Sequence, residues 1–312
     1  MILSTITLNP AVDKTYFVRD FAVNGLNRVD RVKVNMGGKG INVAVTSAKC
    51  GIHCNAAGFV SGYNGQLISK YVKEAGVSSD FVYTEGDTRV NIKIVDTENQ
   101  TYTDINEQGP EISPADLNAL LEKVEDLAVK SDYLYMGGSF HPGLGDDIYK
   151  KIIQIAKERG TTTVLDADGD ALRLGIEAHP HIIKPNQEEL ERLMGYKSKT
   201  INEVCRAAQE IQAGGVETVL VSLGGNGAVA VKDGRIYRVY PLNAPVRSTV
   251  GAGDSFLCGY LYGSSVSDDF TVALRYAMSF ATAKIQTEGT DIPSFEELTK
   301  DFDKVTIEQL EL

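Results

Sequence analysis

Short runs of β-branched and apolar residues alternate with amphipathic stretches of helical period along most of this chain, and that alternation limits the fold more than any other feature. A strand followed by a helix and a second strand forms a right-handed crossover, which places both strands parallel in one sheet. The pattern therefore predicts one α/β domain over residues 1–312, with a mainly parallel sheet covered on both faces. The predicted strands are residues 2–8, 55–60, 133–136, 162–166, 181–184, 219–223 and 228–231. The predicted helices are residues 41–49, 65–74, 114–129, 146–158, 187–194 and 201–213.

Two segments, at about residues 12–35 and 87–107, depart from this rhythm because they alternate apolar and polar residues with no helix between them. In the second segment Val90, Ile92 and Ile94 would share one face of a strand, since successive side chains of a strand point to opposite faces. The segments predict a small antiparallel sheet inserted into the core. A structural flap and a contact between subunits are both open, and we favour a lid that excludes water from a site. Its exposed edges would also allow a homodimer through the lid.

The charge balance excludes several kinds of partner. The chain has 31 Lys and Arg against 42 Asp and Glu, a formal net charge of −11. Proteins that bind nucleic acid usually present a basic stripe, so we expect no such partner. The four cysteines form no CxxC pair, no apolar run is long enough to span a bilayer, and the N-terminus lacks the basic flank of a signal peptide. We therefore expect a cytoplasmic protein with reduced thiols and no membrane partner.

A glycine-rich turn at Ser248–Phe256 (STVGAGDSF) carries the strongest chemical signal. Gly251 and Gly253 allow close backbone approach, and a helix to about Gly263 is predicted to follow. Free N–H groups at a helix N-terminus form an anion site, to which the helix dipole adds positive potential. Asp254 lies in the first turn, where a carboxylate is also an ordinary helix stabiliser. Beside an anion cradle, however, it fits a general base that accepts a hydroxyl proton.

A second glycine loop spans residues 36–44 (MGGKGINVA) and is predicted to open a helix. Its glycines, Gly37 and Gly38, allow backbone to approach a ligand, while Lys39 and Asn42 supply a charge and an amide. The lysine is followed by glycine rather than Ser or Thr, so the loop is not a P-loop. It is not GxGxxG either, which argues against a dinucleotide site.

Two further motifs lie where strands are predicted to end. Lys184-Pro185-Asn186 leads into a helix, and Asn186 and Glu189 would share one helical face. This pair fits two roles, either a capping box or the ordering of Mg²⁺ through water near nucleotide phosphates. The glycine turn at 222–228 (SLGGNGA) would by itself be only a hairpin connection.

These motifs together resemble the phosphofructokinase B family of the ribokinase-like superfamily, and the resemblance covers nearly the whole chain in order. It implies a ribokinase-like three-layer α/β/α core with a mainly parallel sheet and a small β-sheet lid. Within the family the chain is most similar to kinases of fructose 1-phosphate and next to kinases of tagatose 6-phosphate. The matching stretches are Thr7–Asp13, Gly37–Asn42, Thr88–Asn91, Gly138-Ser139, Lys184–Asn186 with Glu189, Ser222–Gly227 and Thr249–Asp254.

The resemblance also implies a role for each matching residue. Asp254 would be the catalytic base, and the amides of Gly251, Ala252 and Gly253 would form the anion hole for the transferred phosphoryl group. Lys39 and Arg89 would hold the phosphate already on the acceptor, for which the planar fork of an arginine is well suited. The residues that would bind the acceptor are Asp13, Gly37, Gly38, Lys39, Asn42, Arg89 and Ser139. The residues that would line the ATP side are Lys184, Asn186, Glu189, Ser222, Gly224, Gly227, Ala277 and Ser279.

The resulting expectation is transfer of a phosphoryl group from ATP, with Mg²⁺, to a ketohexose monophosphate. Fructose 1-phosphate, which would give fructose 1,6-bisphosphate, is favoured over tagatose 6-phosphate, although the sequence separates the two poorly. A non-catalytic sensor of sugar phosphates is a third possibility. The intact Asp254 and its glycine cradle argue against a sensor, which has no need of a base.

Overall fold

The computed structural model describes residues 1–289 and 291–311, and within them a large sheet forms the centre of the body. Its strands are β1 (Ile2–Thr7), β4 (His53–Ser61), β5 (Ser78–Ser79), β6 (Val82–Thr84), β9 (Tyr133–Gly137), β10 (Thr162–Asp166), β11 (Ile182–Ile183), β12 (Thr218–Ser222), β13 (Ala228–Lys232), β14 (Arg235–Val239) and β15 (Ile307–Leu310). The order is β15-β14-β13-β12-β11-β10-β9-β1-β4-β5, with β6 also beside β4. Strands from β12 to β5 pair in parallel, whereas β13, β14 and β15 add an antiparallel edge. The prediction of a mainly parallel sheet is confirmed.

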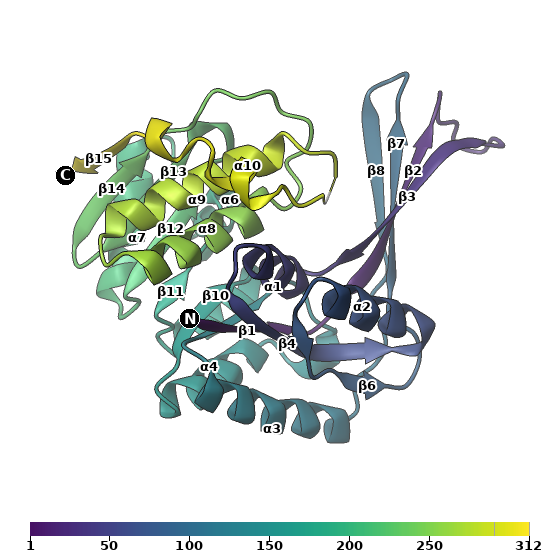
Figure 1. Cartoon of the computed structure of the whole chain (residues 1–312), viewed down its shortest axis with the longest axis horizontal. Coiled ribbons are helices and arrows are strands. Elements are labelled where there is room, and N and C mark those ends of the chain that lie inside the picture. Colours follow the sequence, from purple (N-terminus) through teal and green to yellow (C-terminus); the bar gives the residue numbers. More distant parts are fainter. Residues whose placement is uncertain (290, 312) are drawn as a thin grey trace.

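Helices cover both faces of this sheet (Figure 1). On one face lie α3 (Pro114–Lys130), α4 (Ile148–Glu158), α5 (Gly169–Ile176), α6 (Gln187–Met194) and α7 (Ile201–Ala213). On the other lie α1 (Lys39–Lys49), α2 (Gly62–Glu74), α8 (Ala252–Val266), α9 (Phe270–Ile285) and α10 (Phe295–Thr299). Among the described residues, none of these helices combines the length and apolar composition that crossing a bilayer requires.

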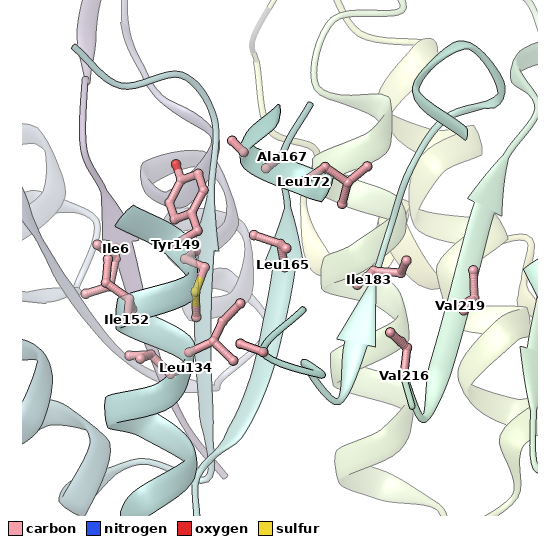
Figure 2. Packing of buried hydrophobic residues seen from close by; sticks show 14 of the residues in the cluster. Ile6, Leu134, Tyr149, Ile152, Leu165, Ala167, Leu172, Ile183, Val216 and Val219 are labelled. Atoms are coloured by element: carbon pink, nitrogen blue, oxygen red, sulfur yellow. The ribbon is translucent and has the colours of Figure 1, made fainter. Parts of the chain in front are cut away.

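The sheet strands are apolar on both sides, as a sheet buried between two helical layers requires. In β9, Leu134 and Met136 belong to the core under α3–α7, while Tyr135 between them belongs to the core under α1, α8 and α9. Figure 2 shows the first of these cores, in which Leu134 lies near Ile152 of α4. The period-two alternation of a strand therefore builds the three-layer α/β/α architecture.

All seven predicted strands and all six predicted helices are present, with ends that differ by three residues at most. The helix after the Gly251 turn ends at Val266 rather than near Gly263. Elements that were not predicted include β14, β15, α5, α9 and α10. Helix α9 has buried residues all around much of its length, so it lacks the single apolar stripe that marks a surface helix in a sequence.

A four-stranded lid projects from the body beside α1 and α2 (Figure 1). Its strands are β2 (Ala11–Val18), β3 (Val29–Gly37), β7 (Val90–Asp96) and β8 (Thr101–Asn106), in the order β3-β2-β7-β8. The prediction that the lid is antiparallel is wrong for its central pair, because β2 and β7 run parallel. Each hairpin leaves the body along its first strand, and these two outward strands lie side by side.

The architecture gathers several chain segments at one edge of the main sheet. Strands β1, β9, β10, β11 and β12 run parallel, so their carboxyl ends meet there. Ligands of open α/β sheets usually bind outside this edge. The segments that follow these strands, together with the lid and the start of α8, form the candidate site.

Candidate active site

The N-terminus of α8 forms an anion-binding turn. Gly251 is the N-cap residue and has a φ of 77°, a left-handed conformation that glycine adopts without strain. Within the helix, the amide of Ser255 donates to Gly251 O at 2.9 Å, and the amides before it are those that an α-helix leaves unpaired. The amide of Ala252 is an exception, since it donates to Thr249 O at 3.2 Å. Of the three predicted donors, Gly251 and Gly253 are therefore better placed to receive an anion.

Two lysines bring positive charge to this turn. A side chain at Gly253 would lie 3.2 Å from Lys184 Nζ, so the ammonium group of this lysine is next to the helix N-terminus. Lys184 Nζ is 3.3 Å and Lys39 Nζ is 2.7 Å from the carboxylate of Asp166, which is fully buried at the end of β10. Burial opposes the ionisation of Asp166, but the charges of Lys184 and Lys39 hold its pKa below the ordinary value. The sequence did not predict that Asp166 joins the two lysines.

Asp254 has the environment of a general base. It is 8% exposed, and Asn42 Nδ2 donates to its Oδ2 at 2.9 Å. Burial raises the pKa of Asp254, and the nearby Asp166 carboxylate adds to this rise, while Lys39 and the hydrogen bond from Asn42 act in the opposite direction. A carboxylate whose proton affinity is raised in this way is suited to take a proton from a hydroxyl group.

A cavity of about 200 Å³ lies between the lid and the body. Asp13 of β2 stands over Gly37, where a side chain would collide with its carboxylate, and it accepts a hydrogen bond of 2.9 Å from Asn91 Nδ2. Burial raises the pKa of Asp13. From the body, the cavity is bounded by Val250 and Gly289. Its polar lid residues are Asp13, Thr15, Asn35, Asn91, Lys93, Asp104 and Asn106. Hydroxyl groups of a sugar are the ligands that such a set of amides and carboxylates can bind.

Arg89 and Lys39 both contact the turn that follows β9. Arg89 Nη2 donates to Ser139 Oγ at 3.2 Å and to Asn9 O at 3.0 Å. Its Nε is buried and has no hydrogen-bond partner among the described residues, which leaves a donor that an anion would satisfy. A side chain at Gly138 would contact Lys39 Cβ at 3.7 Å. The structure thus brings the two predicted cations to one turn, with the ammonium group of Lys39 directed to Asp166 rather than to Arg89.

A larger cavity of about 610 Å³ opens on the other side of the anion-binding turn. The predicted residues that line it are Asn186, Ser222, Gly224, Gly227, Ala252 and Gly253. The sequence did not predict its apolar wall, to which Leu242, Val246, Phe256, Met278 and Ile285 belong. A cavity of this size and character fits a nucleotide, with an apolar slot for the base and the turn of α8 for the phosphates.

The prediction that Ala277 and Ser279 line the ATP side does not fit the structure. Ala277 is fully buried and packs against Gly259 of α8, where a side chain would collide with it. Ser279 is 1% exposed and donates to Leu298 O at 2.6 Å. Both residues face the interior, and the face of α9 that lines the cavity carries Met278, Ala281, Thr282 and Ile285, which follow the spacing of one helical face.

Asn186 and Glu189 form a complete capping box at the start of α6. Asn186 Oδ1 accepts the Glu189 amide, and Glu189 Oε2 accepts the Asn186 amide, both at 2.8 Å. In the part of the chain that the structure describes, no group of three or more His, Cys, Asp or Glu could hold a metal ion. The capping box uses only Oε2 of Glu189, and its other carboxylate oxygen fits a water ligand of Mg²⁺, an ion usually bound through substrate phosphates and water with few protein ligands. The water-mediated role of the pair stays a prediction.

The nucleotide-sized cavity and the polar cavity under the lid both reach the turn that begins α8, the first at Ala252 and Gly253 and the second at Val250. The buried carboxylate of Asp254 follows in the first turn of the helix, and this arrangement defines a phosphotransferase that acts on a small polar acceptor. Comparison with known proteins agrees, since the model of the pfkB family of carbohydrate kinases matches residues 6–297. A 1-phosphofructokinase of Rhodobacter capsulatus is 33% identical over 309 residues, covering 99% of this chain and 98% of the relative. A tagatose-6-phosphate kinase of Staphylococcus epidermidis is 33% identical over 313 residues, covering 98% of this chain and 100% of the relative.

A solved structure, described as a possible 1-phosphofructokinase from Thermotoga maritima, has a TM-score of 0.90 and 27% identity and covers 100% of both chains. The chain belongs to the pfkB family of carbohydrate kinases. It is an ATP-dependent sugar-phosphate kinase with the ribokinase-like fold, as the sequence indicated.

Proposed function

We propose that this kinase converts fructose 1-phosphate to fructose 1,6-bisphosphate. The observation that carries the proposal is the position of Asp254, which is buried in the first turn of α8, directly after the turn that both cavities reach. The acceptor hydroxyl oxygen forms a bond to the γ-phosphorus of ATP, and the bond from that phosphorus to the β–γ bridging oxygen breaks. The hydroxyl proton passes to Asp254, and ADP leaves.

Each part of the site has a role in this transfer. The amides of Gly251 and Gly253 receive the charge that develops on the transferred group, and Lys184 next to them adds a cation. Asn42 holds the carboxylate of Asp254 toward the acceptor. Lys39 is bound to Asp166 and is therefore near the same end of the site. That Lys39 also holds the acceptor's own phosphate stays a prediction.

The acceptor would lie under the lid. Asp13 and Asn91 bind its hydroxyl groups, with the backbone of Gly37 and Gly38 beneath them. Arg89 and Ser139 bind its phosphate. The guanidinium of Arg89 supports this role because burial has removed part of its water, which lowers its pKa and strengthens its attraction to an anion. The lid then excludes water, which suppresses hydrolysis of ATP.

In this scheme Mg²⁺ would accompany ATP and supply positive charge near its phosphates. Asn186 and Glu189 would hold its water ligands from the start of α6. The ion would neutralise charge on the phosphates, whereas the residues above orient the acceptor and remove its proton.

The choice between fructose 1-phosphate and tagatose 6-phosphate is supported by the relatives, several of which are named 1-phosphofructokinase. A coupled assay of ADP release would test it, with fructose 1-phosphate, fructose 6-phosphate, tagatose 6-phosphate and fructose as acceptors at the same ATP concentration. We expect the highest kcat/KM for fructose 1-phosphate. A higher value for tagatose 6-phosphate would replace the proposed acceptor, and ADP release with none of the four would refute the proposal.

We also propose that the protein is cytoplasmic and forms a homodimer through the outer face of the lid. Strand register places the side chains of one row of that face in the order Val34, Lys14, Ile92 and Ile105, and those of the next row in the order Val32, Tyr16, Ile94 and Thr103. Val32 and Val34 are 48% exposed and Ile105 is 53% exposed. A largely apolar face of this kind is usually covered by a partner, and a second copy offers the same surface.

Light scattering after gel filtration would test the dimer. Wild-type protein should elute at twice the mass of one chain. Val34→Asp should give a monomer, because it would replace an apolar side chain of that face by a carboxylate, whereas Lys70→Asp on an exposed part of α2 should remain dimeric. A wild-type monomer at micromolar concentration would contradict the proposal.

A further inference from the structure

A small cavity behind the anion-binding turn contains a lysine that the mechanism above does not use. Lys284, at the end of α9, lines this cavity together with Asn42, Gly251 and Asp254. It is 3% exposed, which is unusual for a lysine. A side chain at Gly251 would lie 3.1 Å from Lys284 Cε, so the lysine stem packs directly against the N-cap residue of α8.

The ammonium group of Lys284 is fixed by the loop that follows α9. It donates to Gly289 O at 2.7 Å and to Thr287 Oγ1 at 3.0 Å. Both acceptors are neutral, and no carboxylate lies within ion-pair distance of Lys284 Nζ among the described residues. The hydroxyl of Thr287 has one proton, for which Lys284 O at 2.8 Å and Asp291 O at 3.0 Å are both within reach, and this contact holds the loop in its shape.

The same loop is the place where the lid touches the body. Arg31 of β3 forms an ion pair of 2.7 Å with Glu288. Lys33, two residues further along β3, donates to Glu288 O at 2.9 Å and forms an ion pair of 2.8 Å with Asp291. These contacts are made from the inner face of the lid, since Lys33 pairs in register with Thr15, two residues along β2 from Asp13.

We propose that Lys284 is a positioning residue for phosphoryl transfer, in which its ammonium group joins the lid-contacting loop to the Gly251 turn and keeps a positive charge behind the anion hole. This inference rests on the proposed kinase function. Closing the lid brings Arg31 and Lys33 to the loop, the loop orients Lys284, and Lys284 supports the turn that receives the transferred group. Lid closure and the shape of the anion hole are thereby coupled.

The electrostatic surroundings make the role of Lys284 measurable. Burial lowers the pKa of Lys284 to about 8, and the charge of Lys33 acts in the same direction, while Asp291 on the loop and Asp254 on α8 oppose it. Lys284 therefore loses its charge as pH rises through about 8. If the charge supports transfer, the kcat of the wild-type enzyme falls over the same range.

A lysine at the end of a helix also stabilises that helix through the dipole, so loss of activity alone would not establish a positioning role. The experiment compares wild type with Lys284→Met, Lys33→Met and, as a matched control, Lys304→Met, which removes an exposed lysine. For each, kcat is measured with saturating ATP and fructose 1-phosphate from about pH 6 to about pH 10, and folding is checked by thermal melting.

We expect Lys284→Met to lower kcat by about tenfold to a hundredfold and to abolish the alkaline decline, because its side chain has no proton to lose. Lys33→Met should move the decline to higher pH, since it removes a like charge from Lys284. Lys304→Met should retain both the rate and the decline. A folded Lys284→Met protein that keeps the wild-type kcat, or that keeps the decline near pH 8, would overturn the inference.

If Lys284→Met fails to fold, the Lys33→Met profile decides, because an unchanged decline in that variant would also overturn the inference. The outcome is separate from that of the proposed function. A wild-type enzyme that phosphorylates none of the sugar phosphates refutes the proposed function. An active wild type whose kcat and alkaline decline are unchanged by Lys284→Met refutes only the positioning role.

Discussion

Replacing Asp254 by asparagine should nearly abolish activity without weakening the fold. Asparagine has the same shape, and its side-chain oxygen can still accept the hydrogen bond from Asn42 that now reaches Asp254 Oδ2 at 2.9 Å. The substitution therefore leaves the anion-binding turn and both cavities in place. What it removes is the ability to accept a proton from the acceptor hydroxyl.

The size of the effect follows from that single loss. A positioned general base contributes a factor of about 10² to 10⁴ to the rate, and each factor of ten corresponds to about 1.4 kcal/mol of activation free energy. Asp254→Asn should therefore lower kcat by two to four orders of magnitude, or about 3 to 5 kcal/mol, with little change in the KM for ATP.

The same substitution should raise the stability of the fold. Burial raises the pKa of Asp254, so the folded state holds this proton more tightly than the unfolded state does. Stability is then lost as pH rises through the folded-state value, and at neutral pH the buried charge destabilises the fold. A neutral asparagine removes that cost.

The assay pairs steady-state ADP release at pH 7.5 with thermal unfolding of the same preparations. We expect a variant with an unchanged or higher unfolding midpoint and a kcat reduced at least about a hundredfold. A kcat within tenfold of wild type would show that Asp254 is not the base. A lower midpoint together with lost activity would instead indicate that the residue is needed for structure.

Three further outcomes are expected. Arg89→Ala should raise the KM for the sugar phosphate by more than about tenfold and leave the KM for ATP unchanged. An unchanged acceptor KM in steady-state kinetics would show that Arg89 does not bind the phosphate. Lys39→Met should move the acid limb of the kcat/KM profile to higher pH, because Lys39 is the largest influence that lowers the pKa of Asp254; a limb that stays in place would contradict this coupling. Gly259→Ala should lower the free energy of unfolding by about 1 to 3 kcal/mol, since the added carbon would lie 2.3 Å from a carbonyl oxygen of α9. Gly225→Ala, which meets no atom within 4 Å, is its control in denaturant titrations, and equal midpoints would refute the packing argument.

The sequence predicted the body of the fold because its strands and most of its helices obey simple periodicities. It failed where burial removes the periodic signal. Helix α9 is apolar over much of its surface, since one side packs on α8 and another lines the nucleotide cavity. Because the helix was not predicted, its faces could not be assigned to the cavity or to the interior. Ala277 and Ser279 were therefore predicted to line the cavity in place of Met278 and Thr282.

Other parts of the candidate site depend on which segments meet in space. Asp166 stands at the end of a strand, where an acid is common, and nothing in its neighbours along the chain indicates that Lys39 and Lys184 both reach it. The contacts between Lys284, the loop after α9 and β3 join residues about 250 positions apart, as with Lys33 and Asp291. The glycine turns and Asp254 could be predicted because the residues that define them are neighbours along the chain.

The close packing of α8 on α9 has a consequence for how the two substrates are held. A side chain at Gly259 or Gly263 would collide with backbone atoms of α9, so the backbones of the two helices are in direct contact. One of them begins with the proton acceptor, and the other forms a wall of the nucleotide cavity. The base and this wall of the ATP cavity therefore belong to one closely packed unit, and of the two substrates only the sugar is bound by the lid. ATP should consequently be aligned before the lid shuts, and the step that readies the enzyme for reaction is delivery of the acceptor to an arrangement that is already complete.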